Sequence, residues 1–469
     1  MASTVEKIPA GLLGTYYAAR HTYGQYRSCA IACRLHNSLP PDSFLSILKF
    51  ALAKNILRHP NLCHGITDLD PESGEAYFTR LEAINWSSVV EEHACDRGQS
   101  PDEELAALMG KAHQTLFTDQ ERSPAWKLLM LRHEDSKVVD LILVSHHAIC
   151  DGMSATAFHQ SLLGFLLEGA ASAKPETNWI VNSEWPVKVP QTVTAPVPVE
   201  RSIMLSKEQS SIPETSPPPS TFTPWAANPP TLSTFISRAH FLTVPRHQLD
   251  SLTEIRTRLG VSLTGYIHSL LVSYLSLHIP SARGFKSGTP YSLRRFTGCA
   301  AAEMVNHMSS IDSNWDEELV QEIRRPAKTV AEEEQIIQKI SQQFRADLKR
   351  ETARVLLDGP TMLRDISQIR DLGQFCEESM KKRGYTYELS NLGDIELPTP
   401  EQEPSKLRAE KLLFTQCGMV TGPSFGCNVV GVKGGDLVIG ITWQEGIIEE
   451  DLIVGMARFL KGRFAQASR

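Results

Sequence analysis

The sequence predicts a layered α/β protein made of two domains with similar content. Three observations support this prediction. The chain has 469 residues, which is long for a single hydrophobic core. Segments with strand-like and helix-like spacing of apolar residues alternate in both halves. Between Pro175 and Pro230 lie twelve of the 28 prolines, a density that interrupts both patterns. We therefore expect domains over residues 1–175 and 233–469, joined by a Pro-rich connector or crossover over 176–232.

The first domain is expected to begin with a strand over residues 26–35. A helix follows over 42–57, because Phe44, Leu48, Leu52 and Ile56 are four residues apart. Prolines precede and follow this segment, as is typical of helix ends. The other elements predicted here are a helix over 102–116, strands over 126–132 and 137–145, and a helix over 153–166.

The second domain is predicted to repeat this mixture of elements. A long helix over residues 331–357 has an apolar stripe through Ile336, Ile340, Phe344 and Leu348, with acidic residues near its start and basic residues near its end. The turn at Gly434-Gly435-Asp436 should join two strands as a hairpin. The other predicted elements are strands over 233–244, 284–293, 411–419, 427–433 and 437–443, and helices over 247–259, 262–277 and 449–463.

Composition and charge exclude several classes of function. The net charge of -7 argues against a general nucleic-acid binder. No segment has the length and apolarity of a membrane span, and the N-terminus lacks the apolar core of a signal peptide. Nine cysteines are scattered from Cys29 to Cys427 without a CxxC pair, which favours reduced thiols in an intracellular protein. We expect a cytoplasmic protein; loose membrane association through an amphipathic helix stays open.

The most informative feature is the run from His146 to Gly152, HHAICDG. It follows the apolar strand that ends near Val144 and precedes the helix that begins near Met153. A histidine at the end of a core strand is held in place and can still face a cavity. Asp151 lies four residues after His147, and Gly152 permits a tight turn into the helix. The run therefore predicts one positioned imidazole and one positioned carboxylate, an arrangement suited to proton abstraction.

The residues alone leave several alternatives open. Because successive strand side chains point to opposite faces, His146 and His147 are not expected to face the same cavity, and the pattern does not say which one is the base. A satisfied structural histidine is one alternative. A metal site built from both histidines and Asp151 is another, although no third ligand lies at a convincing spacing, and we expect no metal. No G-x-S-x-G elbow, P-loop or dinucleotide fingerprint is present.

The HHxxxDG pattern resembles the motif of the condensation-like, chloramphenicol-acetyltransferase-type superfamily of CoA- and carrier-protein-dependent acyltransferases. Within it, the chain most resembles the fungal alcohol acetyltransferase family. The resemblance covers essentially the whole chain, and segments beyond the motif contribute by their order. These segments are Tyr17-Ala18-Ala19-Arg20-His21, Arg58-His59-Pro60-Asn61-Leu62, Ser123-Pro124-Ala125-Trp126-Lys127-Leu128, Pro290-Tyr291-Ser292-Leu293-Arg294 and Ser390-Asn391-Leu392-Gly393.

The resemblance implies two chloramphenicol-acetyltransferase-like domains that form a V or sandwich around a central tunnel. His147 would be the general base: it would take the proton of an acceptor hydroxyl as that oxygen attacks an acyl-CoA thioester, and would return a proton to the departing thiolate. Acetyl-CoA or another acyl-CoA would be a co-substrate, with no permanently bound cofactor. The expected partners are a small-molecule alcohol and acyl-CoA, and a monomer is expected.

The resemblance also assigns roles to other residues. Asp151 would be structural and would pair with Arg294 of the second domain; Arg295 is a less favoured partner, and two surface arginines are the alternative. Gly152 completes the motif.

Three further residues are candidates for the tunnel. Ser390 and Asn391 would contact the acyl or pantetheine group or the oxyanion, whereas an ordinary turn before Gly393 is the alternative. His146 is a further tunnel candidate. The plant branch of the superfamily carries a DFGWG segment that is absent here, so the oxyanion donor stays open. Lys381-Lys382-Arg383 is a candidate for the CoA phosphates, but we favour a solvated surface.

The resulting expectation is a CoA-dependent O-acyltransferase that forms an ester on an alcohol or on a secondary-metabolite hydroxyl. Two alternatives stay open. One is a condensation-like enzyme that catalyses cyclisation or dehydration, or uses a carrier-bound acyl substrate. The other is a non-catalytic binding protein on the same fold.

Overall fold

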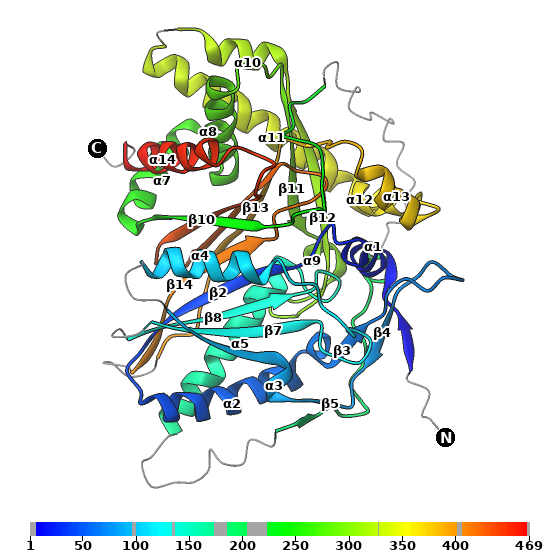
Figure 1. The fold of residues 1–469 in the computed structure, drawn as a ribbon. Helices are drawn as coiled ribbons and strands as arrows, with labels where there is room; N and C mark the ends of the chain where they lie inside the picture. Colours follow the sequence, from blue (N-terminus) through cyan, green and yellow to red (C-terminus); the bar gives the residue numbers. More distant parts are fainter. Residues whose placement is uncertain are drawn as a thin grey trace.

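The protein is built around two large β-sheets, one mainly from each half of the chain (Figure 1). The first half forms the blue and cyan lower part of Figure 1, and the second half forms most of the upper part. The computed structural model describes residues 6–95, 100–133, 137–172, 185–203, 223–326, 328–400 and 406–466.

The lower sheet has five strands in the order β14-β2-β8-β7-β6, and only the β6–β7 pair is parallel. Helices cover both of its faces. Leu141 and Leu143 of β8 pack in one apolar cluster with α2 and α5, whereas Ile142 and Val144 pack with α4 on the other face. The elements are β2 (Cys29–Asn37), α2 (Pro41–Arg58), β6 (Val90–Ala94), α4 (Pro101–Ala112), β7 (Trp126–Arg132), β8 (Val138–Ser145), α5 (Gly152–Ser172) and β14 (Leu407–Gln416).

Smaller elements surround this sheet. A three-stranded sheet has the order β1-β4-β3, and β5 pairs with β9 in a two-stranded one. The elements are β1 (Lys7–Pro9), α1 (Gly11–Thr22), the 3₁₀ turn η1 (Pro60–Cys63), β3 (His64–Ile66), β4 (Tyr77–Arg80), β5 (Ala83–Ile84), α3 (Trp86–Val89), β9 (Val187–Lys188) and α6 (Val199–Ser202).

The upper sheet has six strands in the order β10-β16-β15-β13-β11-β12. Its own apolar core includes residues of α8, α10, α11 and α14. The strands are β10 (Ser237–Val244), β11 (Phe285–Ser292), β12 (Met308–Trp315), β13 (Tyr387–Ile395), β15 (Phe425–Val432) and β16 (Leu437–Gln444). The helices are α7 (Arg246–Leu259), α8 (Leu263–His278), α9 (Arg294–Thr297), α10 (Glu317–Arg324), α11 (Val330–Asp358), α12 (Thr361–Ser367), α13 (Leu372–Ser379) and α14 (Glu450–Gln466).

Strand β14 connects the two halves. It follows β13 in the chain, yet it pairs antiparallel with β2 at the edge of the lower sheet, as the orange strand in Figure 1 shows. Lys411 of β14 lies opposite Arg34 of β2, and Asp102 at the start of α4 binds both, with Lys411 Nζ at 2.7 Å and Arg34 Nη1 at 2.5 Å. The domain limits drawn from the sequence stay a prediction, but the second segment contributes this strand to the first sheet.

A second contact between the halves involves α1, which lies against α12 and α13. In Figure 1 these two yellow helices lie next to dark-blue α1. Residues far apart in the sequence therefore meet beside α1, where the cavity described below is found.

The layered α/β class and the long predicted elements are confirmed. The hairpin of β15 and β16 is present as predicted. The Pro-rich connector, whose proline density is expected to interrupt helical and strand patterns, contains α6, a single helical turn that begins after Pro198. Residues 176–184 and 204–222 of the connector lie outside the described residues.

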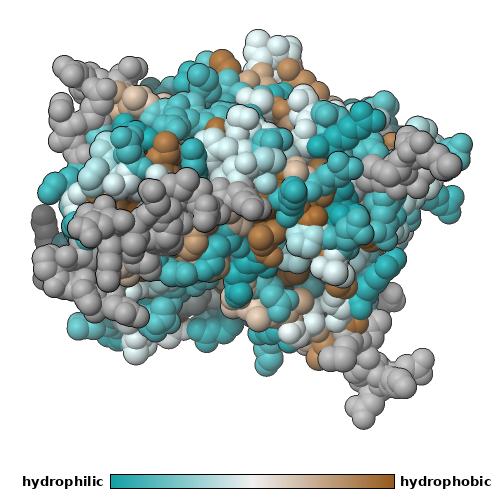
Figure 2. All heavy atoms as spheres, turned by 90° about the horizontal axis from the view of Figure 1, so that it is seen from below, coloured by the Kyte–Doolittle hydropathy of each residue, from teal (hydrophilic) through white to brown (hydrophobic). Residues whose placement is uncertain are grey.

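The surface is mostly hydrophilic on the face seen in Figure 2, where hydrophobic residues form small separate groups. The exposed large apolar side chains of the described residues come from distant parts of the chain, for example Leu57, Leu277 and Val330. In the described part of the chain, the helices are too short or too polar to cross a membrane.

Candidate active site

A cavity of ≈ 790 Å³ lies where the two halves meet. The first half contributes α1 and the loop between β8 and α5. The second half contributes β11, β13, α11 and α12, and β14 also reaches the wall. This volume is within the range typical of small-molecule sites, about 300–1,000 Å³.

His147 reaches this cavity from the loop that follows β8. Strand β8 ends at Ser145 and α5 begins at Gly152, so the histidine lies at the predicted strand-to-helix corner. Its side chain is 8% exposed and lines the cavity. The Tyr17 ring stacks on the imidazole with centroids 4.0 Å apart, and the Tyr26 ring meets it edge-on at 5.2 Å. Two aromatic rings therefore hold the imidazole in one orientation.

The environment of His147 keeps its imidazole neutral at physiological pH. Burial lowers the pKa of His147 to about 4. Its own backbone and the negative charge of Asp151 act in the opposite direction and raise the pKa, but they do not outweigh burial. Nδ1 is buried and makes no hydrogen bond to the described residues, so Nε2 is the nitrogen that can meet a substrate. A neutral imidazole at a cavity wall can accept a proton.

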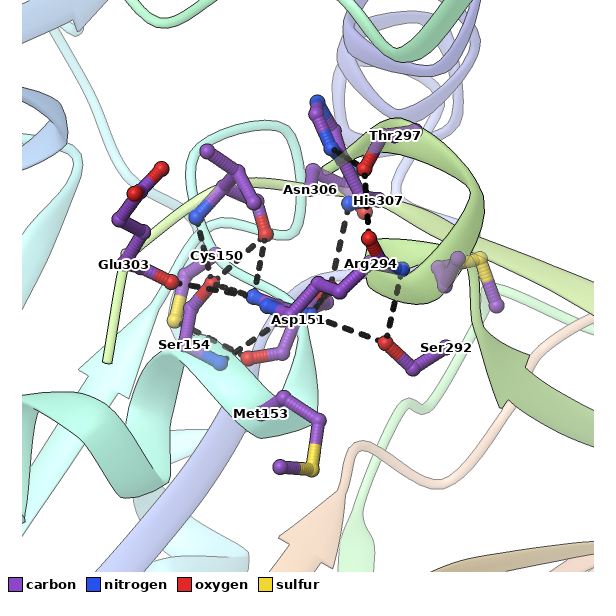
Figure 3. Close-up of polar contacts among 12 residues, drawn as sticks. Cys150, Asp151, Met153, Ser154, Ser292, Arg294, Thr297, Glu303, Asn306 and His307 are labelled. Carbon is purple, nitrogen blue, oxygen red and sulfur yellow. Dashed lines mark hydrogen bonds and ion pairs between the residues drawn. The ribbon is translucent and has the colours of Figure 1, made fainter. Parts of the chain in front are cut away.

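Asp151 belongs to a buried network with Arg294 (Figure 3). Arg294 Nη1 donates to Asp151 Oδ2 at 2.8 Å, and Nη2 donates to Oδ1 at 3.0 Å. The Asp151 side chain is 5% exposed and the Arg294 side chain is 7% exposed. Although burial opposes ionisation, the Arg294 guanidinium holds the pKa of the Asp151 carboxyl below its usual value. The predicted pair between the two halves is therefore present in the structure.

Other groups complete this network and tie it to the second half. The Ser154 amide donates to Asp151 Oδ1 at 2.7 Å at the start of α5, and the His307 amide donates to Oδ2 at 3.1 Å. Ser154 Oγ bonds both backbone groups of Val305, which precedes His307. The two oxygens of Asp151 thus accept four hydrogen bonds, one from Ser154 on α5 and three from Arg294 and His307 of the second half.

Asn306 joins the same loop directly to the predicted base. Its Nδ2 donates to the carbonyl oxygen of His147 at 2.7 Å. Sequence reasoning missed Asn306, because nothing near it in the chain indicates that it lies beside residue 147. It also missed the Ser154 amide, although an aspartate just before a predicted helix typically accepts a hydrogen bond from the backbone amide two or three residues later.

Gly152 packs closely against the second half of the chain. A Cβ at this position would lie 2.6 Å from Cδ2 of Leu392, which is on β13. A larger residue would therefore require the Leu392 side chain to move.

His146 and His147 do point to different places. His146 is 1% exposed and is not among the residues that line the cavity. Its ring packs against His21, with centroids 4.5 Å apart, and its Nδ1 accepts a hydrogen bond from the Ala148 amide at 3.0 Å. The structure thus answers the question that the alternation of strand side chains left open: the second histidine faces the cavity.

Ser390 and Asn391 both line the cavity, and they lie on strand β13 rather than in an ordinary turn. The register with β15 shifts after Asn391, whose side chain donates to Thr264 Oγ1 at 3.1 Å and accepts from the Gly393 amide at 2.9 Å. Arg295 takes no part in the Asp151 pair; its guanidinium lies over the Phe296 ring.

The prediction of a solvated basic run at 381–383 is wrong for Arg383. This residue is 3% exposed and donates to the backbone carbonyls of Asn228, Met419 and Pro423. Lys381 pairs with Glu378 at the surface, and Lys382 lines the cavity. In the described part of the chain, no group of histidine, cysteine and carboxylate side chains could hold a metal ion.

Comparisons with known proteins agree with this geometry. The family model described as alcohol acetyltransferase matches residues 9–216. The chain is 24% identical over 425 residues to the probable alcohol acetyltransferase FCK4 of Fusarium pseudograminearum, covering 87% of this chain and 84% of the relative. It is 23% identical over 454 residues to the probable alcohol acetyltransferase crmB of Aspergillus fumigatus, covering 94% and 95%.

Solved structures show the same fold. The trichothecene 15-O-acetyltransferase TRI3 of Fusarium sporotrichioides matches with a TM-score of 0.68 at 13% identity, over 98% of this chain and 94% of that one. The first condensation domain of the CDA synthetase matches with a TM-score of 0.59 at 13% identity, over 100% and 97%. The predicted condensation-like fold and the resemblance to fungal alcohol acetyltransferases are therefore confirmed.

Proposed function

The chain is an acyltransferase similar to the fungal alcohol acetyltransferases, and from this premise we propose that it transfers an acetyl or related acyl group from CoA to an alcohol. The product is an ester. The observation that carries the proposal is the neutral imidazole of His147, held by two tyrosine rings at the wall of a cavity that is large enough for both reactants.

In the proposed reaction, His147 Nε2 accepts the proton of the acceptor hydroxyl while the hydroxyl oxygen attacks the thioester carbonyl. The imidazolium then gives its proton to the CoA sulfur as the C–S bond breaks. The histidine ends the cycle neutral, so no acyl-enzyme is needed. A positioned base contributes about 10²–10⁴ to the rate, and holding both reactants together contributes further.

Asp151 and Arg294 are positioning residues in this proposal, because their network lies behind the loop rather than at the reacting atoms. Asn306 has a similar role through the His147 carbonyl. Ser390 and Asn391 are candidates for contact with the acyl group or the oxyanion, since both line the same cavity.

The direct test is the release of free thiol from acetyl-CoA in the presence of a panel of alcohols, with ester product measured in parallel. We expect turnover by the wild-type protein and a loss of about 10²–10⁴ in kcat for His147→Ala. His146→Ala is a matched control for a neighbouring imidazole that does not face the cavity. Near-wild-type turnover by folded His147→Ala would reject the assignment of the base, and no thiol release with any alcohol would reject the reaction.

We also propose that the enzyme works as a cytoplasmic monomer. All nine cysteines are unpaired, and one chain supplies the base, its positioning network and the cavity wall. Gel filtration at the concentrations used for activity would test the oligomeric state, and an active species twice the mass of the chain would contradict it.

A further inference from the structure

Several charged side chains that the proposed reaction does not use line the cavity, and two of them are linked to the ring of Tyr26, which contacts His147. These two are Arg20 on α1 and Glu388 on β13. Each residue is half-buried. Keeping two charged groups in an interior is costly unless something in the cavity or the wall binds them.

Arg20 has more hydrogen-bond donors than partners. Its guanidinium lies over the rings of Tyr16 and Tyr26, with its central carbon 5.5 and 5.2 Å from their centroids. Nη2 donates to Thr421 Oγ1 at 3.3 Å, and Arg20 forms no ion pair with any carboxylate that the structure describes. A guanidinium has five N–H donors. Several of them are thus available to an oxygen atom in the cavity.

Among the described residues, Arg20 has free hydrogen-bond donors, whereas Glu388 has a free acceptor oxygen. Gln416 Nε2 donates to Glu388 Oε1 at 2.6 Å, and the Gln416 side chain is itself fixed, because Tyr26 Oη donates to its Oε1 at 2.6 Å. The other carboxyl oxygen receives no hydrogen bond from the described residues. Burial raises the pKa of Glu388, against the opposing effects of Gln416 and Arg20.

Tyr26 links these two groups to the reacting centre. Its ring contacts His147 edge-on, lies under Arg20, and is hydrogen-bonded through Gln416 to Glu388. A ligand that places one hydroxyl at His147 therefore brings its neighbouring atoms to a wall with both a cation and a carboxyl.

We propose that Arg20 and Glu388 form a subsite for a second polar group of the acceptor, so that the enzyme acts on a polyoxygenated alcohol of several rings or branches rather than on a simple alkanol. The Arg20 guanidinium binds a carbonyl, ether or carboxylate oxygen of the acceptor, and the Glu388 carboxyl binds a further hydroxyl. This inference rests on the proposed acyl transfer and names its acceptor class.

A physical argument favours this class. A small alkanol displaces water from two charged groups without replacing the lost hydrogen bonds, which lowers affinity. An acceptor with matching oxygens replaces those bonds, and sites built to bind a polar group reject analogues that lack it.

The test compares acceptors that share one carbon skeleton. Decahydro-2-naphthol, decahydronaphthalene-2,6-diol and the corresponding hydroxyketone are each supplied with acetyl-CoA, and kcat/KM is measured by thiol release. We expect the wild-type protein to prefer the diol and the hydroxyketone over the mono-alcohol by about tenfold or more, since one hydrogen bond to a charged group is enough for such a factor. Equal kcat/KM values for the three acceptors would overturn the proposal.

Two variants locate the preference. Glu388→Met should make kcat/KM for the diol about equal to that for the mono-alcohol. Arg20→Met should make kcat/KM for the hydroxyketone about equal to that for the mono-alcohol. Glu168→Met and Arg246→Met are matched controls, because both remove exposed side chains that are paired outside the cavity wall. An unchanged preference in both folded cavity variants, or a change in the KM for acetyl-CoA alone, would show that the pair serves the acyl donor and would overturn the proposal.

Calorimetric binding of the three acceptors without CoA separates this inference from the proposed reaction. If no thiol is released but the wild-type protein binds the diol and the hydroxyketone more tightly than the mono-alcohol, the subsite stands and the acyl transfer fails. If thiol is released but binding shows no preference, the acyl transfer stands and the subsite fails. The wild-type series requires no variant to fold.

Discussion

Two buried aspartates in the first half, Asp140 and Asp151, use the same chemistry in different places. Asp140 is 0% exposed and Asp151 is 3% exposed. Each carboxylate binds an arginine through two hydrogen bonds: Arg34 at 2.8 and 2.9 Å from Asp140, and Arg294 at 2.8 and 3.0 Å from Asp151. The two contacts are alike in burial and in their paired hydrogen bonds, although Arg34 also binds Asp102.

Their surroundings differ. Asp140 is inside strand β8, its arginine is on the neighbouring strand β2, and its second oxygen also bonds His133. Asp151 lies in the loop that carries His147, and its arginine comes from the second half of the chain. A buried ion pair is thus no evidence of function by itself. Its connection to a residue at a cavity decides whether its loss affects chemistry or only stability.

The largest effect is expected from Asp151→Ala. The variant leaves Arg294 buried and unpaired, which should lower the free energy of unfolding by about 3–5 kcal/mol. It also releases the loop that positions His147, and a small displacement of a catalytic group costs about 10² in rate. Urea unfolding and thiol-release assays on the folded fraction measure both effects.

A double variant separates the two consequences of this change. Asp151→Leu with Arg294→Met removes both charges and should recover much of the stability, because no unpaired charge remains. Activity should stay low, since the hydrogen bonds from Ser154 and His307 are still lost. Full recovery of turnover would contradict the positioning role of Asp151.

Asp140→Ala should lower stability and leave the chemistry nearly unchanged, in contrast to Asp151→Ala. Arg34 then loses its two-bond partner but keeps Asp102, so the free energy of unfolding should fall by less than for Asp151→Ala, by no more than about 3 kcal/mol. The folded fraction should keep kcat within about threefold of the wild type, because Asp140 does not line the cavity and contacts none of the groups around His147. A loss of kcat as large as that of Asp151→Ala would show that position relative to the cavity does not separate the two pairs.

The sequence predicted one of these pairs and missed the other for a physical reason. Asp151 is part of a motif that also contains the base, so its role follows from local spacing together with the family resemblance. The partners of Asp140 are Arg34 on β2 and His133 just after β7, and they become its neighbours only when the strands pair in the observed register. Long elements such as α11 and β8 could also be predicted from local sequence, because the spacing of their own apolar residues defines them.

What the sequence could not give is the contact between distant segments. The transfer of β14 to the lower sheet, the bond from Asn306 to His147 and the convergence of Arg20 and Glu388 all join residues hundreds of positions apart or on separate sheets. Their local patterns are ordinary. Arg383 shows the same limit, since a basic run looks solvated until three distant carbonyl groups are found around it.

A smaller effect is expected from Lys411→Met, at the outer end of the Asp140 network. Asp102, which Lys411 binds at 2.7 Å, is 35% exposed and also keeps Arg34 as a partner. The free energy of unfolding should therefore fall by no more than about 1 kcal/mol, and the difference from wild type should shrink at high salt. Urea unfolding at low and high ionic strength measures this. A loss as large as that of Asp140→Ala would mean that Lys411, rather than the buried aspartate, holds β14 in the sheet.

The smallest effect is expected from pH, and it separates the base from both carboxylates. Burial lowers the pKa of His147 from 6.5 to about 4, so the imidazole is already neutral at pH 6.5. Because the neutral form is the active base, kcat/KM should stay nearly constant from about pH 8 down to pH 6.5, whereas an unperturbed histidine would lose about half of its neutral form there. Below this range the unfolded chain takes up protons that His113, His147 and His268 refuse in the folded state, so stability falls as pH falls towards 4. Activity must therefore be read where unfolding is absent, and a midpoint near pH 6.5 in the still-folded protein would show that the imidazole is solvated rather than enclosed by Tyr17 and Tyr26.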